Sequence, residues 1–195
     1  FWIAGGTGTP EGLAQARALG AQGIQVGTLF AYCDESGITP ELKRSVLAAV
    51  VEGKADVKTD ALASPTGFPF KVVQWAGDPA TQVTRKRVCD LGYLRVAYAM
   101  PNGRVGYRCP SEPEAEFVAK GGAIEETVGR KCLCNALLST IGQPQERKDG
   151  PAEPPLVTSG DELVRLGRFL DGRSSYTAAE ALQWLLTPAA VTPAG

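Results

Sequence analysis

The sequence predicts an α/β fold that corresponds to a partial (β/α)8 TIM barrel, namely its last two βα units, followed by a β-hairpin and an α-helical extension. Three observations predict it. Two strand-helix patterns follow one another in residues 1–53, an Asn-Gly turn lies between two extended runs in residues 54–110, and helical patterns occupy residues 111–195. A complete barrel needs about 250 residues. We therefore expect this 195-residue chain to be the carboxyl-terminal fragment of a longer protein.

The first strand-helix unit begins at the first residue of the chain. Phe1–Ala4 is a short apolar run that stops at Gly5-Gly6, which is typical of a buried strand. Thr9-Pro10-Glu11 then supplies a helix N-cap, a proline at the first helical position and an acidic first turn. The pattern predicts a helix that ends at Gly20.

The second unit repeats this pattern. Gly23–Val26 is the predicted strand, with Gly27-Thr28 at its carboxyl end. Thr39-Pro40-Glu41 again caps a helix, which ends at Gly53. Short strand-helix connections imply parallel strands, with ligands bound at their carboxyl ends.

Residues 54–110 predict loops and a hairpin rather than a third unit. Pro101-Asn102-Gly103 separates the extended runs Tyr93–Met100 and Arg104–Arg108, and Asn-Gly tolerates the positive φ angles that a tight hairpin turn requires. A helix is expected over Pro79–Asp90.

Residues 111–195 predict helices joined by loops. Helical patterns cover Pro113–Lys120 and Glu125–Ile141, and Ser159 is expected to cap a third helix. Thr177 and Glu180 have the spacing of a capping box at the start of the last helix.

The composition excludes several classes of function. The chain has 20 Lys plus Arg against 21 Asp plus Glu, so a nucleic-acid partner is not expected. No apolar run approaches the roughly 20 residues that span a bilayer, so no membrane partner is expected either. The chain contains no His, which excludes a His base or a His-ligated metal within it.

The cysteines predict a reduced protein without a metal site. There are five, and their spacings match no zinc finger or ribbon. Cys132 and Cys134 are expected to act as small buried apolar residues. Free thiols favour a cytoplasmic location.

The glycines at the two predicted strand ends are candidate ligand-binding residues. Gly5-Gly6 and Gly27-Thr28 would let backbone N-H groups approach a phosphate, and Thr28 adds a hydroxyl donor. This pattern predicts that they hold the phosphate of a mononucleotide cofactor. The alternative is that these glycines only form tight strand-to-helix turns.

Six segments of the chain carry a resemblance to a known family. They are Phe1–Gly6, Gly23–Thr28, Glu35-Ser36, Thr59-Asp60, Ser64–Phe70 and Arg130–Asn135. The first three resemble the last two βα units of the nitronate monooxygenases, also called 2-nitropropane dioxygenases. The other three are similar to a bacterial branch of that family with a long carboxyl-terminal extension.

The resemblance implies an FMN-dependent enzyme that oxidises alkyl nitronates with dioxygen to carbonyl compounds and nitrite. It implies contacts to the FMN phosphate and ribityl chain from Ala4, Gly5, Gly6, Gln25, Val26, Gly27 and Thr28. The catalytic base of well-studied members is a His outside these two units. The sequence therefore identifies no catalytic residue within this chain, and it does not predict an oligomeric state.

Two other functions stay open. The same superfamily resemblance extends to flavin-dependent enoyl reductases that act with polyketide or polyunsaturated fatty-acid synthases and consume NADPH. The chain could also be a binding domain without chemistry, which the absent His favours and the glycine-rich strand ends disfavour.

Overall fold

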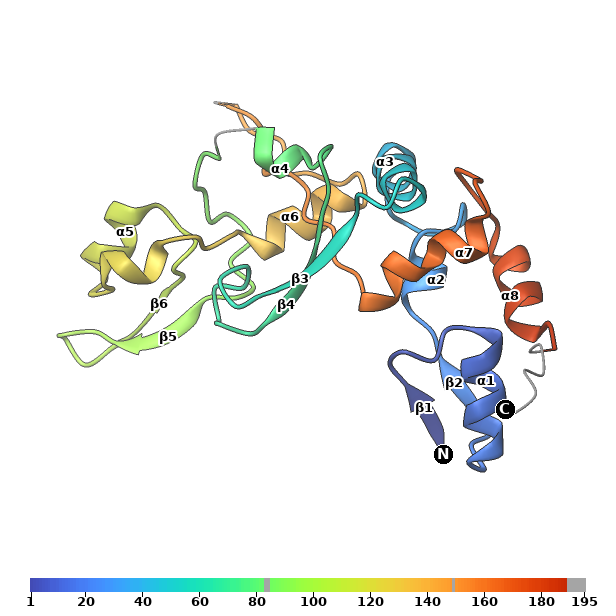
Figure 1. The fold of residues 1–195 in the computed structure, drawn as a ribbon. Helices are drawn as coiled ribbons and strands as arrows, with labels where there is room; N and C mark the ends of the chain where they lie inside the picture. The colour runs from blue at the N-terminus through green and yellow to red at the C-terminus, as the bar shows by residue number, and fades with distance from the viewer. Residues whose placement is uncertain (83–84, 149, 189–195) are drawn as a thin grey trace. The chain divides into compact units, whose positions relative to one another are not determined.

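The computed structural model describes residues 1–82, 85–148 and 150–188 (Figure 1). The chain divides into two compact units. The first unit contains residues 1–57 and 73–77 together with the described residues from Ser159 onward, and the second contains residues 58–72 and the described residues of 78–158.

The first unit is built on a parallel strand pair. Its elements within residues 1–57 and 159–188 are β1 (Trp2–Ala4), α1 (Pro10–Ala18), β2 (Gly23–Gln25), α2 (Thr28–Ala31), α3 (Pro40–Val51), the 3-10 helix η2 (Asp161–Arg165), α7 (Leu166–Leu170) and α8 (Ala178–Leu186). β1 and β2 pair in parallel with Ala4 opposite Gln25, as the short connection predicts. Thr9 caps α1 by accepting a hydrogen bond from the Gly12 N-H at 3.0 Å.

The predicted partial TIM barrel is wrong. The described strands form three separate two-stranded sheets, β1-β2, β3-β4 and β5-β6. After α3 the chain enters β3 (Asp56–Asp60), which pairs with β4 (Phe70–Gln74) and not with β2. A barrel requires each strand to pair on both sides. The two strand-helix units of residues 1–53 therefore form a two-stranded parallel sheet, and the described chain has a mixed α/β fold without a continuous parallel sheet.

The core of the first unit combines residues from its two main sequence segments, 1–57 and 159–188. Tyr176 is fully buried, and its hydroxyl donates a hydrogen bond to the Leu29 carbonyl at 2.7 Å. The Phe169 ring packs edge-on against Tyr176, with ring centroids 4.8 Å apart, and lies 4.9 Å from the ring of Trp184. Residues after Ser159 therefore complete the core that residues 1–57 begin.

The remaining elements are β3, β4, α4 (Pro79–Gln82), β5 (Val96–Ala99), β6 (Val105–Arg108), α5 (Glu114–Ala119), the 3-10 helix η1 (Ile124–Thr127) and α6 (Leu133–Thr140). The predicted hairpin is confirmed, because β5 and β6 pair antiparallel from Val96 opposite Arg108 to Ala99 opposite Val105. Gly103 in its turn has φ +76°. An apolar cluster forms the core of the second unit and contains Ala63, Val72, Leu133, Ala136 and Leu156.

Three predicted helices differ in the structure. The one expected over Glu125–Ile141 is split into η1 and α6, because Val128 is extended and Gly129 has φ +71°. The helix expected from Ser159 begins at Asp161, with Gly160 at its N-cap. Of Pro79–Asp90 only the α4 residues are helical; residues 83 and 84 lie outside the described residues.

The non-helical course of residues 85–90 has a physical reason in two arginines. Arg85 donates to the Ser111 carbonyl at 2.9 Å, and Arg87 donates to the Pro110 carbonyl at 3.1 Å and the Thr127 carbonyl at 2.8 Å. These bonds tie the segment to distant loops, whose carbonyls accept them. Tertiary contacts thus override a local helical pattern.

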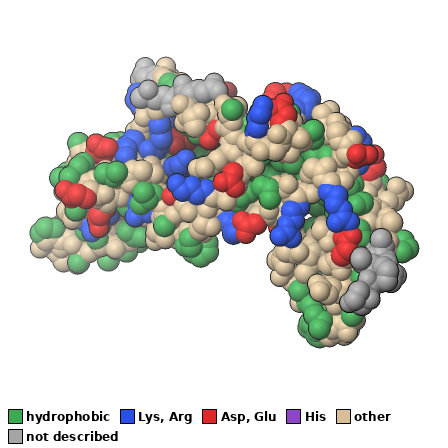
Figure 2. Space-filling model, in the orientation of Figure 1, with side chains coloured by type: hydrophobic (Ala, Val, Ile, Leu, Met, Phe, Trp, Pro, Cys, Tyr) green, Lys and Arg blue, Asp and Glu red, His purple; other side chains and the backbone are tan. Residues whose placement is uncertain are grey.

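No helix in the described part of the chain has the length and apolar character that crossing a bilayer demands. On the face in Figure 2, Lys and Arg side chains lie among Asp and Glu side chains. This interleaving agrees with the near-zero net charge.

The predicted capping box of α8 is confirmed, and its contribution to the free energy of unfolding should be measurable. Thr177 Oγ1 accepts from the Glu180 N-H at 3.2 Å, and Glu180 Oε2 accepts from the Thr177 N-H at 2.7 Å. Thr177→Ala should lower the free energy of unfolding by about 1 kcal/mol in urea denaturation. Thr39→Ala is the matched control, since Thr39 stands at the N-cap of α3 without a side-chain capping bond. Equal losses in both variants would contradict the assignment.

Candidate anion-binding site at the glycine turns

The parallel register brings the predicted site residues to one edge of the strand pair. Ala4 lies opposite Gln25, so the Gly5-Gly6 turn and the Val26–Thr28 turn leave the sheet side by side. Gly5 and Gly6 have φ +82° and +71°, in the left-handed region that favours glycine. A Cβ at either position would meet no atom within 4 Å, so the backbone conformation is what calls for glycine here.

A carboxylate occupies the space between the two turns. The Gly6 N-H donates to Glu162 Oε1, and the Thr28 hydroxyl lies 3.5 Å from Glu162 Oε2 as a donor. The Gly160 N-H in turn donates to Thr28 Oγ1 at 3.1 Å, and a side chain at Gly160 would clash with Glu162. We call the Gly6 N-H and the Thr28 hydroxyl together the Gly6–Thr28 cradle. It holds an anionic group that the chain itself supplies.

A small cavity adjoins the cradle, and an exposed arginine lines it. Its volume is about 20 Å³, room for about one water molecule. Val26, Gly27, Thr28, Glu162 and Arg165 are among the residues that line it. The Arg165 guanidinium is exposed and has neither a hydrogen bond nor an ion pair to another described residue. It is therefore available to an incoming anion.

An apolar groove borders the same site. Val26 lines both the small cavity and a groove of about 430 Å³, whose other walls include Trp2, Ile24, Phe30 and Leu182. Ligand pockets are commonly about 300–1,000 Å³ and largely apolar, with few polar groups. The cradle and the groove together present anion donors next to apolar surface.

The structure brings most of the predicted cofactor residues together. Val26, Gly27 and Thr28 line the cavity, and Gly6 donates to the carboxylate that borders it. Ala4 and Gln25 are exposed strand-end residues and are not among those that line the cavity. Thr28 is the most enclosed of the set, at 8% exposed.

Sequence reasoning missed Glu162, Gly160 and Arg165. Thr28 and Glu162 are 134 residues apart, and the segment around Glu162 has the pattern of an ordinary amphipathic helix. No local signal marks the carboxylate as a partner of the glycine turns. Only the packing of η2 against α2 could show it.

The donor set suits oxygen anions. A backbone N-H and a hydroxyl donate charge-assisted hydrogen bonds to carboxylate or phosphate alike, and a guanidinium pairs with either. Two anions in one such site repel each other, so a bound phosphate and the Glu162 carboxylate would compete for the same donors. The site can therefore bind an external anion only if Glu162 gives up these bonds.

Comparison of the chain with protein-family models, with curated proteins and with solved structures found no match in any of the three. The resemblance to the nitronate monooxygenases stays a prediction that rests on the residues themselves.

Proposed function

We propose that this chain supplies the phosphate-binding part of an FMN site in an enzyme that oxidises alkyl nitronates with dioxygen to carbonyl compounds and nitrite. The observation that carries the proposal is the convergence of the Gly6 N-H and the Thr28 hydroxyl on one anionic group. FMN, when bound, would supply the redox chemistry, and the protein would supply binding and orientation.

The residues present fit a phosphate monoester with an apolar body. Gly6, Thr28 and Arg165 would bind the phosphate oxygens. Gly5 and Gly27 carry no side chain that would stand between the backbone and the ligand. The groove that begins at Val26 offers apolar surface next to the phosphate donors.

Glu162 has a distinct role in this proposal. Its carboxylate satisfies the cradle while no phosphate is bound, so that the Gly6 N-H and the Thr28 hydroxyl keep hydrogen-bond partners. Phosphate binding would require this carboxylate to leave the cradle. Glu162 thus sets the affinity of the site without contacting the ligand.

A second candidate, a binding domain without chemistry, is favoured by the same carboxylate. Donors that the chain already satisfies internally need no ligand, and the cradle would then only anchor η2 to the strand pair. The FMN-dependent enzyme and the binding domain differ in one measurable property. Only in the enzyme should the phosphate group of a ligand strengthen the binding of that ligand to the chain.

The first test compares FMN with riboflavin, which lacks the phosphate, by flavin fluorescence titration of the purified protein. FMN should bind at least about tenfold more tightly, a difference of about 1.4 kcal/mol. Thr28→Val should remove most of that preference and leave riboflavin affinity unchanged. Thr39→Val is the matched control and should change neither affinity. Equal affinities for FMN and riboflavin in the unaltered protein would refute the phosphate site.

The second test uses Glu162→Gln, which removes the competing charge. FMN affinity should rise by about tenfold because the cradle is released from an anion that repels phosphate. Glu41→Gln is the control, since Glu41 is an exposed first-turn residue of α3. If neither the unaltered protein nor Glu162→Gln binds FMN, the binding domain without chemistry is the function that is left.

An activity assay of the FMN-loaded protein distinguishes the two enzyme functions. A nitronate monooxygenase should release nitrite from an alkyl nitronate, whereas an enoyl reductase should consume NADPH with an enoyl thioester.

A further inference from the structure

The second unit contains an apolar groove that is separate from the proposed FMN site. Its volume is about 500 Å³, which is within the range of about 300–1,000 Å³ common for small-molecule pockets. Residues from three segments of the second unit form its walls, namely 64–70, 93–94 and, in α6, 133–138. The groove therefore has the size of a small-molecule site.

The base of the groove is part of the core. Leu133 is buried, lines the groove and belongs to the apolar cluster of the second unit. Phe70 and Leu94 also line the groove, and both pack against that cluster. Core packing therefore holds the base of the groove in place.

Large apolar side chains at the rim of the groove are left in contact with solvent. Phe68, Tyr93 and Leu137 are all exposed although they line the groove. The Phe68 ring meets the Phe70 ring edge-on, with ring centroids 5.9 Å apart. A ligand in the groove would remove apolar surface from water at these side chains, and this removal favours binding.

Hydrogen bonds hold the loop that carries Phe68. Arg130 Nη1 donates to the Ser64 carbonyl at 2.7 Å and to the Ala61 carbonyl at 3.0 Å. The Gly67 N-H donates to the same Ser64 carbonyl at 3.1 Å. This wall of the groove is thus formed before any ligand binds, which lowers the entropic cost of binding.

One hydroxyl of this loop can donate a hydrogen bond to a ligand. Ser64 and Thr66 both line the groove, and their hydroxyl oxygens lie 2.7 Å apart. This hydrogen bond uses one of the two hydroxyl protons, so the other is left over. Because Ser64 is only 1% exposed whereas Thr66 is exposed, the proton that a ligand can reach is that of Thr66.

We propose that this groove binds a neutral, largely apolar small molecule with a carbonyl oxygen that accepts a hydrogen bond from the Thr66 hydroxyl. None of the described residues that line the groove is Asp, Glu, Lys or Arg, so a charged ligand would lose its hydration without gaining a counter-charge. A carbonyl oxygen accepts hydrogen bonds and donates none, which matches the spare hydroxyl proton. The ligand class is therefore that of apolar ketones and esters.

A second copy of the chain fits the groove less well than a small molecule does. A standard protein interface takes about 20–30 residues from each side. The three segments that form the walls contain fewer residues than that together. The groove also contains none of the residues proposed to bind FMN, so the two proposals succeed or fail separately.

The first experiment titrates the purified protein with Prodan, a neutral fluorescent naphthalene that carries one ketone. Phe68→Ser and Leu137→Ser, both at exposed positions on the walls, should each weaken Prodan binding by at least about tenfold. Ile141→Ser is the matched control, since Ile141 is exposed at the C-cap of α6 and does not line the groove. A loss in Ile141→Ser as large as in the two groove variants would overturn the proposal.

The second experiment tests the hydrogen bond from Thr66. Thr66→Val should weaken Prodan binding by about fivefold and should leave the affinity for dimethylaminonaphthalene, which lacks the ketone, unchanged. The emission of bound Prodan should also move to shorter wavelength, because its ketone loses a donor. Thr59→Val, at an exposed position of β3, is the control and should change neither affinity. Equal losses for the two probes in Thr66→Val would contradict the assigned donor.

The third experiment locates the bound probe without any variant. Cys134 lines the groove and is partly exposed, whereas Cys89 is partly exposed and does not line it. With Prodan at about three times its Kd, iodoacetamide should modify Cys134 about fourfold more slowly and Cys89 at an unchanged rate, read by peptide mass spectrometry. An unchanged rate at Cys134 would overturn the proposal. A dimer that Phe68→Ser separates into monomers would place a second copy in the groove and overturn it as well.

Discussion

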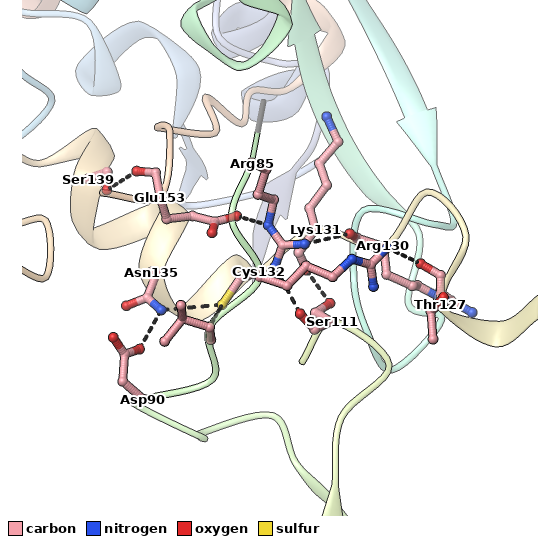
Figure 3. A network of polar contacts seen from close by, with 12 residues as sticks. Arg85, Asp90, Ser111, Thr127, Arg130, Lys131, Cys132, Asn135, Ser139 and Glu153 are labelled. Carbon is pink, nitrogen blue, oxygen red and sulfur yellow. Dashed lines mark hydrogen bonds and ion pairs between the residues drawn. The ribbon is translucent and has the colours of Figure 1, made fainter. Parts of the chain in front are cut away.

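Replacing Glu153 by Leu should lower the free energy of unfolding by about 3–5 kcal/mol, because it leaves a buried arginine without its counter-charge. The Glu153 side chain is 2% exposed and its carboxylate pairs with Arg85 Nε, whose side chain is 17% exposed (Figure 3). Arg85 also donates to the carbonyls of Ser111 and Arg130. An uncompensated guanidinium at this junction would have to draw in water or abandon those carbonyls.

Urea denaturation with matched variants tests this expectation. Glu52→Leu removes the carboxylate of an exposed ion pair with Lys54 and should change the free energy of unfolding by no more than about 1 kcal/mol. Arg85→Met combined with Glu153→Leu should cost less than the sum of the two single changes, because the double variant leaves no unpaired charge. A Glu153→Leu effect as small as that of Glu52→Leu would show that the pair is not buried.

Lys43→Met should cost about 3 kcal/mol or more. The Lys43 side chain is buried in the first unit, at 5% exposed, and its ammonium group donates to three carbonyls. They belong to Cys33 at 2.8 Å, Asp34 at 2.9 Å and Ser36 at 3.2 Å. Hydrogen bonds to a charged group are worth about 1.5–3 kcal/mol each, and carbonyls left without a donor add a desolvation penalty. Methionine keeps an unbranched side chain, one heavy atom shorter, and removes the charged ammonium group with its donors.

Two measurements define the outcome of this substitution. Urea denaturation should separate Lys43→Met from Lys54→Met, since the Lys54 side chain is 69% exposed and its loss should cost less than about 1 kcal/mol. Hydrogen exchange should also accelerate at the Asp34 amide, which donates to the Tyr176 carbonyl at 2.8 Å and depends on the same turn. If the Asp34 amide exchanges as slowly as in the unaltered protein, Lys43 does not hold this turn.

The parts of the fold that local signals predict are those whose determinants lie a few residues apart. Thr9 and Pro10 begin α1, Asn102-Gly103 turns the β5-β6 hairpin, and Thr177 with Glu180 caps α8. Each involves residues within about four positions of one another, and each reflects hydrogen bonds or φ angles that the residue types themselves favour. These predictions are confirmed.

The predictions that failed depended on distant partners. The extension of the β1-β2 pair into a barrel required further strands beside it, but β3 pairs with β4 instead. The helix expected through Asp90 is absent beyond residue 84 because Arg85 and Arg87 find carbonyls more than 20 residues away. In both cases the local pattern was compatible with more than one partner, and packing selected one.

By itself the sequence determined where the glycine turns lie, which helices are capped and where the hairpin reverses, because these properties reside in short runs of residue types. Only the tertiary structure decided that Glu162 enters the Gly6–Thr28 cradle and that Lys43 is buried against the Cys33–Ser36 turn. The physical reason is that these groups gain stability from charge and burial, and both arise only when chain segments that carry no common pattern pack together.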